Sequence, residues 1–303
     1  MAFFKSIKEG GLLLVDSIKV LIKKPILTIP LLFSWFIFAA VVLFIEYYLN
    51  QRFEYISYGI YILAFFVLLF IVTLVICTSN IVMLGIVEQI ESGEKIKFSK
   101  ALRKGFTNIL KVIPLAIIWA IIWMILLILK SFTKEKSGKD KDISVRNAAR
   151  ILAGADNPFS WWRVGLDMLE KALRMWIFLA LPAVAWENKG SFEALKKSTQ
   201  IVKKHPIQFL TSYTLTGATA LVMALPLIPI FYADELGIVF SSTIWTFVII
   251  YECIIWTFGI YLEQMSIGLL YLWHMKWEKK GSKGDLSSVK KPDLLDNFYE
   301  LKK

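Results

Sequence analysis

Two acidic residues stand inside a long apolar stretch that contains no lysine or arginine. Glu252 and Glu263 lie within residues 238–275, and 11 positions separate them. In an α-helix this separation is about three turns, so both carboxylates share one face. Acids inside a membrane span are functional candidates, because hydrocarbon does not solvate them, and they can relay protons or bind a cation. The alternative is that one of them lies at a membrane interface, since the stretch is longer than a bilayer needs.

A second group of charges opens the helix expected over 165–187. Asp167 and Lys171, and likewise Glu170 and Arg174, are four residues apart, a spacing that favours ion pairs on a helix surface. These side chains either line a polar entry or belong to a solvated start of the helix.

Other reactive residue types are sparse. The sequence has no glycine-rich phosphate loop, no H-E-x-x-H motif and no G-x-S-x-G motif. Its two histidines, His205 and His274, stand beside lysines at span edges and are interpreted as surface or interface residues. Its two cysteines, Cys77 and Cys253, lie deep in apolar runs and are interpreted as small core residues. We therefore predict no catalytic residue, metal or cofactor, and a lipid-modifying enzyme is the least favoured hypothesis.

The elements that must position these residues are membrane helices. Hydrophobic residues make up 57% of the chain, above the roughly 45–50% of soluble domains. Five stretches free of lysine and arginine are long enough, or nearly so, for the roughly 20 residues that cross a bilayer. We predict an all-α polytopic membrane bundle, one domain over 1–280, followed by a charged, loosely ordered cytoplasmic tail at 281–303. The six expected spans are 25–49, 56–87, 112–129, 165–187, 206–231 and 238–273.

Basic amphipathic helices precede three of these spans. Their apolar residues recur at helical spacing and their lysines lie elsewhere, which is typical of helices that lie in the headgroup plane. We expect them to contact anionic lipid headgroups of the bilayer, and the net charge of +11 is assigned to this role rather than to nucleic-acid binding. The residues expected at the headgroups are Lys23, Lys24, Lys100, Arg103, Lys104, Lys196, Lys197, Lys203 and Lys204.

The distribution of basic residues predicts the orientation. If the N-terminus is inside, the inside segments carry five basic residues in 1–24, six in 88–111, five in 188–205 and eight from 276 onward. The outside segments carry one in 50–55, eight in 130–165 and none in 232–237. The positive-inside rule therefore favours both termini inside. The loop 130–165 is the exception, and a shallow hairpin of 112–129 and 165–187 would instead make it cytoplasmic.

An internal similarity links the two ends of the chain. The run SIKVLIKKP at 17–25 resembles STQIVKKHP at 198–206, and each precedes a span, a short loop and a longer second span. This suggests parallel repeats over 10–94 and 190–283. The alternative is convergence, because helices that lie in the plane before a span share this composition.

The order of these features resembles a family. The features are the KKP entry at 23–25, a charged helix end at 85–93, a basic helix at 98–104, RNAARIL at 146–152 and LPAVAWENKGSFEALKKS at 181–198. They resemble an uncharacterised six-span prokaryotic membrane family. That family is similar in layout to the membrane domain attached to some glycerophosphodiester phosphodiesterases and to etoposide-induced-2.4-like proteins. The resemblance covers most of 1–280, implies fold and location only, and supplies no catalytic residues.

Two functional hypotheses follow from the sequence. The first is a non-enzymatic scaffold or organiser of the cytoplasmic leaflet of the cell membrane, based on the three basic helices. The alternative is a small-solute or ion transporter that uses Glu252 or Glu263. The sequence does not indicate an oligomeric state.

Overall fold

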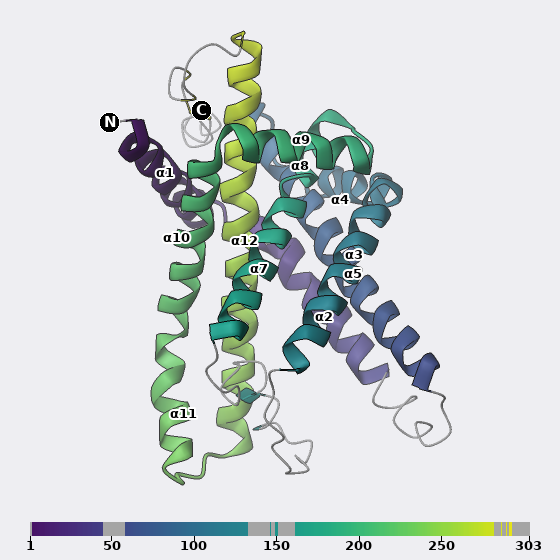
Figure 1. The fold of residues 1–303 in the computed structure, drawn as a ribbon, viewed down its shortest axis with the longest axis vertical. Coiled ribbons are helices and arrows are strands. Elements are labelled where there is room, and N and C mark those ends of the chain that lie inside the picture. The colour runs from purple at the N-terminus through teal and green to yellow at the C-terminus, as the bar shows by residue number, and fades with distance from the viewer. Residues whose placement is uncertain are drawn as a thin grey trace.

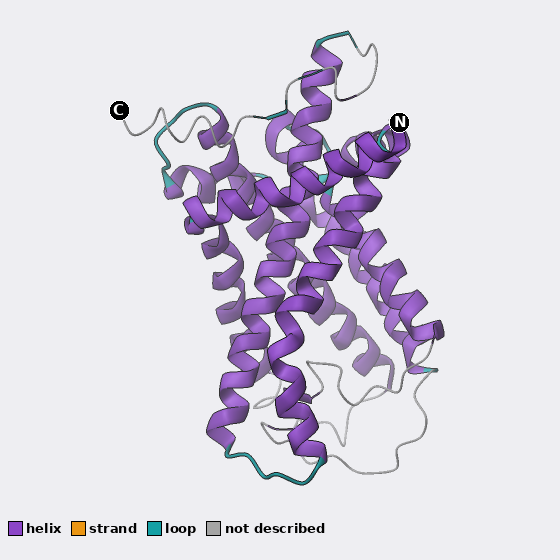
Figure 2. Cartoon of the chain, turned by 90° about the vertical axis from the view of Figure 1, so that its left-hand side faces the viewer, coloured by secondary structure: helices purple, strands orange, loops and turns teal. Residues whose placement is uncertain are grey.

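The computed structural model describes residues 2–44, 58–132, 146, 149–150, 161–281, 286, 289 and 291–292. Within these residues the regular secondary structure is helical, with no strand (Figure 2). Four of the described helices are long and apolar enough to cross a membrane, and a fifth crossing is obtained if one bent pair counts as a single span. The protein is therefore an all-α, multi-pass membrane protein.

The three basic amphipathic helices gather at one end of the bundle (Figure 1). They are α1 (Ala2–Lys23), α4 (Phe98–Thr107) and α9 (Ser191–Lys204). Helix α1 lies across the bundle (Figure 2) and packs against α10 (Pro206–Ala224) and α12 (Ser242–Lys279). We refer to this end as the basic end.

Two helices extend well beyond the thickness of a bilayer, as the sequence predicts. Helix α3 (Tyr58–Glu91) has 34 residues and α12 has 38. At 1.5 Å per residue they are about 51 and 57 Å long, against a hydrocarbon core of about 30 Å. Helix α5 (Ile109–Ser131) lies beside α3 and is of ordinary length, with 23 residues. It begins before Pro114, which lies inside the helix rather than at its start.

Turns at prolines interrupt three of the expected spans. The span 25–49 begins as the 3-10 turn η1 (Pro25–Thr28) and continues as α2 (Ile29–Phe44), bent by 103° from α1. The span 206–231 divides into α10, η4 (Leu225–Leu227) and α11 (Ile228–Glu235). Proline lacks a backbone N–H and its ring clashes with the preceding turn, so helices restart at Pro25, Pro226 and Pro229.

The fourth expected span, 165–187, is also divided. It forms α7 (Trp161–Phe178) and the short α8 (Leu181–Glu187), in which Pro182 occupies the first turn. Neither helix is among those long and apolar enough to cross a membrane. By length and composition, the described residues thus show four spans, or five with the bent pair.

The apolar core is concentrated toward the basic end. Every residue of α12 from 260 to 271 is buried, against segments of α3 and α8. The opposite half of α12 is different, because only Trp245 and Val248 are buried between 242 and 250. Close backbone approach tightens the packed half: a Cβ on Gly105 of α4 would lie 2.5 Å from Val82 Cγ2 of α3.

Part of the predicted loop 130–165 lies at the end opposite the basic helices. Arg146 and Arg150 bind Asp234 of α11 at 2.8 and 2.7 Å, and only 4% of Asp234 is exposed. These contacts neutralise basic residues of the loop that was exceptional in the charge count. Most of that loop, and the expected end of the first span at 45–49, lie outside the described residues.

A few described positions of the predicted tail contact the helical bundle. Leu286 is buried, Trp273 Nε1 donates a hydrogen bond to the Val289 carbonyl at 2.9 Å, and Lys291 pairs with Asp16 of α1. At these described positions, the tail packs against α1 and α12.

Candidate functional site

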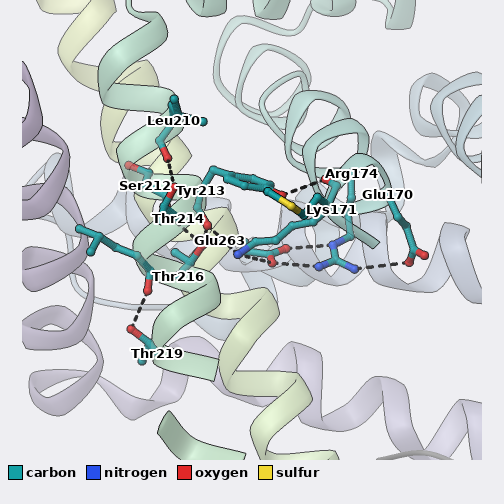
Figure 3. Close-up of polar contacts among 12 residues, drawn as sticks. Glu170, Lys171, Arg174, Leu210, Ser212, Tyr213, Thr214, Thr216, Thr219 and Glu263 are labelled. Atoms are coloured by element: carbon teal, nitrogen blue, oxygen red, sulfur yellow. Dashed lines mark hydrogen bonds and ion pairs between the residues drawn. The ribbon is translucent and has the colours of Figure 1, made fainter. Parts of the chain in front are cut away.

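A buried ion pair joins α7 to α12 near the middle of the bundle. The Arg174 guanidinium donates two hydrogen bonds to Glu263, Nε to Oε2 and Nη2 to Oε1, each 2.9 Å long (Figure 3). Only 5% of Glu263 is exposed. Two parallel N–H···O bonds hold a carboxylate in a fixed orientation, and they are among the strongest polar contacts in proteins.

A lysine from the same turn of α7 lies beside this pair. Lys171 Nζ is 3.8 Å from Glu263 Oε1, donates to the backbone carbonyl of Tyr213 at 2.7 Å, and lies 4.9 Å from the centre of the Tyr213 ring. A Cβ on Gly217 of α10 would approach Lys171 Nζ to 2.7 Å. The glycine therefore leaves the space that the ammonium group occupies, and α10 closes one side of the cluster.

The charges continue from α7 to α5. Lys130, at the end of α5, pairs with both Asp167 and Glu170 at 2.5 Å. Glu170 is also 3.9 Å from Arg174, which confirms one of the two predicted i,i+4 pairs. The other is wrong, because Asp167 contacts Lys130 while Lys171 turns to α10 and α12. Three basic and three acidic side chains thus form one neutral network, which we call the central network: Lys130, Asp167, Glu170, Lys171, Arg174 and Glu263.

A cavity of about 620 Å³ extends from this network between α12 and the α10–α11 segment. Arg174 and Glu263 lie at one end, while Tyr232 and Glu235 of α11 line the other and are exposed. The cavity therefore reaches the surface near the end of the bundle opposite the basic helices. Most of the remaining lining is apolar: Ala220, Ala224, Leu227, Ile228, Phe231, Ile255, Trp256, Gly259 and Ile260.

Glu252 lines the same cavity as Glu263. Both of its carboxylate oxygens are buried, and neither has a hydrogen-bond partner among the described residues. The sequence prediction placed the two acids on one face of a helix, and they do face one cavity. The partners of the two carboxylates differ, however: the Arg174 guanidinium binds Glu263, whereas no described residue binds Glu252.

The residues predicted to contact anionic lipid divide into two groups. Lys104 and Lys197 turn inward to pair with Glu88 and Glu278. Lys24 is half-buried. The other six are exposed at the basic end: Lys23, Lys100, Arg103, Lys196, Lys203 and Lys204.

Even the exposed group contains pairs within the protein. Lys100 lies 2.6 Å from Glu94, and this hydrogen bond lowers the pKa of the Glu94 carboxyl. Lys204 lies 4.8 Å from the centre of a Trp277 ring. A cavity of about 350 Å³ beside α4 is lined by both Lys100 and Glu94, so its charges are mixed.

The two histidines differ from their interpretation as surface residues. His205 and His274 are buried, and His205 Nε2 is 3.0 Å from His274 Nδ1. Burial, followed by the neighbouring His274 and Lys204, lowers the pKa of His205 to about 4. The His205–His274 contact joins the start of α10 to the end of α12. Within α12, His274 Nε2 also lies 3.2 Å from Glu278 Oε1.

Chemically, the arrangement is suited to holding a ligand. The site consists of a charge network, an adjoining cavity and one acid that has no partner among the described residues. No group of three His, Cys, Asp or Glu side chains in the described part of the chain is placed to hold a metal ion. Comparison of the chain with protein-family models, with curated proteins and with solved structures gives no match.

Proposed function

We propose that this multi-pass protein is a transporter that binds a small molecule in the cavity between α12 and α10–α11. The observation that carries the proposal is the asymmetry of α12. From Glu263 to Tyr271, toward the basic end, every residue of the helix is buried; on the other side of Glu263 the helix borders a cavity that reaches the surface. A site open to one face and closed to the other is what alternating access requires.

The central network lies at the boundary between the packed and hollow halves. Buried ion pairs are costly to desolvate, and an apolar replacement is often as stable, so their presence inside a membrane bundle favours a functional role. In this proposal the Arg174–Glu263 pair forms the floor of the cavity. It holds α7 against α12 while the cavity faces the side away from the basic helices.

Cysteine accessibility in α12 tests alternation directly. In a background in which Cys77 and Cys253 are replaced by alanine, Gly259→Cys places a thiol in the cavity, where a Cβ meets nothing within 4 Å. Gly268→Cys is the matched control in the packed half, where a Cβ would lie 3.4 Å from Leu84 Cδ2.

A membrane-impermeant maleimide is applied to vesicles of each orientation. We expect rapid labelling of Gly259→Cys from the side away from the basic helices and slower, measurable labelling from the basic side. Gly268→Cys should label slowly from both. Labelling of Gly259→Cys from one side only, or from neither, would contradict alternating access.

The scaffold function remains a second candidate, supported by the six exposed basic residues at the basic end. Each basic residue near an anionic leaflet contributes about 1 kcal/mol. The test compares quenching of tryptophan fluorescence by brominated anionic and zwitterionic lipids around the full-length protein. Replacement of Lys196, Lys203 and Lys204 by glutamine should reduce the preference for anionic lipid; an unchanged preference would count against this role.

The finer topology belongs to the same proposal. We infer six passes, with α2 and the α7–α8 pair completing the four long spans, both termini in the cytoplasm and the protein in the cell membrane. The positions of Arg146 and Arg150 beside α11 support an outside location for that loop. Membership of the six-span prokaryotic family and duplication of 10–94 as 190–283 also remain proposals. Reporter fusions at the two termini and in the loop 130–165 test the orientation.

A further inference from the structure

The cavity contains one acid that no described residue neutralises. Four charged residues line it, and two of them, Arg174 and Glu263, form the bidentate pair. The third, Glu235, is exposed and lies 3.6 Å from Arg150 Nη2. The fourth, Glu252, has both carboxylate oxygens buried without a partner among the described residues. The lining therefore lacks one positive charge.

The missing charge defines the chemistry that fits. An ionised carboxylate in an apolar surrounding is costly unless it is paired, so the site is completed by a proton or by a cationic ligand. The site offers an anion no uncompensated positive charge among the described residues that line it, because the Arg174 guanidinium is bound by Glu263. Lys171 beside this pair is held by the Tyr213 carbonyl and by Glu263. Charge complementarity therefore selects for cations.

The rest of the lining describes the body of the ligand. Phe231, Tyr232 and Trp256 contribute aromatic rings, and aromatic faces attract cations as well as apolar groups. A volume of about 620 Å³ is that of a site for a drug-sized organic molecule rather than for a bare metal ion. Glu252 and Glu263 are about 16 Å apart along α12, which leaves apolar wall between the lone acid and the floor of the cavity.

We propose, on the basis of the transport function above, that the cavity binds a hydrophobic organic cation. The Glu252 carboxylate supplies the counter-charge, and Phe231, Tyr232 and Trp256 surround the apolar body. A proton occupies Glu252 when the ligand is absent, so ligand and proton compete for one group.

The test uses two probes of one shape and opposite charge. Tetraphenylphosphonium is a rigid apolar cation, and tetraphenylborate is the corresponding anion. Binding of each to the full-length protein in nanodiscs is measured after subtraction of the signal from empty nanodiscs. We expect saturable binding of the cation and none of the anion. Glu252→Gln should weaken cation binding at least tenfold, while Glu252→Asp should retain most of it. Glu193→Gln, an exposed acid on α9, is the matched control and should leave it unchanged.

A second readout protects the test against misfolded variants. In the Gly259→Cys background, tetraphenylphosphonium should slow maleimide labelling at least fivefold, and adding Glu252→Gln should remove that protection. Equal binding of both probes, or cation binding that survives Glu252→Gln, would overturn the cation assignment. Absence of saturable cation binding while Gly259→Cys still labels from both sides would overturn it too, yet leave the transport proposal standing. Failure of transport itself would appear separately, as labelling of Gly259→Cys from one side only.

Discussion

Replacement of Arg174 by methionine is the most direct perturbation of the central network. The change keeps an unbranched apolar side chain in place of the arginine stem but removes both 2.9 Å hydrogen bonds to Glu263. Glu263 then remains almost fully buried, at 5% exposure, with Lys171 Nζ at 3.8 Å as the nearest cation. The variant therefore leaves a carboxylate with only partial compensation.

The expected magnitude follows from this geometry. Removing one partner of a buried pair costs about 3–5 kcal/mol, and the remaining Lys171 places Arg174→Met near the lower value. With an unfolding entropy of about 2 cal/mol/K per residue, a loss of about 3 kcal/mol lowers the melting temperature of a 303-residue chain by roughly 5 °C. Glu263→Gln should cost less, because Arg174 keeps Glu170 at 3.9 Å.

A double-mutant cycle separates the pair from its surroundings. Thermal unfolding is followed in detergent micelles for Arg174→Met, Glu263→Gln and the double variant. We expect the double variant to be more stable than the sum of the single effects predicts, by about 2 kcal/mol. The exposed pair Glu94–Lys100 is the control, and the same cycle there should show no measurable coupling. Additive effects at Arg174 and Glu263 would refute the view that the two residues stabilise one another.

Three further perturbations test other parts of the structure. The pKa of His205 is about 4 in the folded protein and about 6.5 when unfolded, so the neutral imidazole contributes its full share of the unfolding free energy above pH 6.5. Acidification from pH 7 to 5 should therefore remove about 2 kcal/mol of that free energy. In thermal unfolding, His205→Gln should lose this pH dependence. Gly105→Ala should cost about 1–3 kcal/mol through the clash with Val82, and Val82→Ala should restore part of the loss in the same unfolding assay. Asp234→Asn should cost about 2 kcal/mol of unfolding free energy, since Arg146 and Arg150 lose the buried negative charge and one of the two carboxylate oxygens that bind them. An unchanged melting temperature would contradict that pairing.

The helices themselves were largely predictable from the sequence. Long stretches without basic residues predict membrane spans because the cost of lysine or arginine in hydrocarbon is local and large. The excess length of α3 and α12 follows from the length of their apolar runs. The spacing of apolar residues predicts the amphipathic character of α1, α4 and α9. Prolines also signalled the places where spans begin, and Pro182, Pro226 and Pro229 marked positions where a helix could kink. The sequence could not tell a kink from a full break there, because membrane helices often tolerate proline.

The site was only half predictable. Spacing along α12 placed Glu252 and Glu263 on one face, and both face the cavity. The partner of Glu263 is 89 residues away on α7, and no local pattern links the two. Lys130 carried a weak signal, since it ends an apolar run, but its bonds to Asp167 and Glu170 depend on how α5 packs against α7. The pairing of His205 with His274 likewise required the tertiary structure.

The contrast between the two halves of α12 shows why hydropathy could not locate the cavity. Lipid tails and a protein interior are equally apolar, so a helix segment facing either one has the same composition. By length and composition α12 qualifies as a single membrane span, although 260–271 is enclosed by protein and 242–250 is mostly not. What distinguishes the halves is whether a buried acid borders empty volume. In the packed half, Tyr261 donates to the Ser17 carbonyl and Gln264 Nε2 to the Phe178 carbonyl, while Gln264 Oε1 is buried without a partner among the described residues and away from the cavity. In the hollow half, neither carboxylate oxygen of Glu252 has a partner among the described residues, and Glu252 lines the cavity. An unsatisfied acid beside empty volume indicates a ligand more directly than apolar composition does.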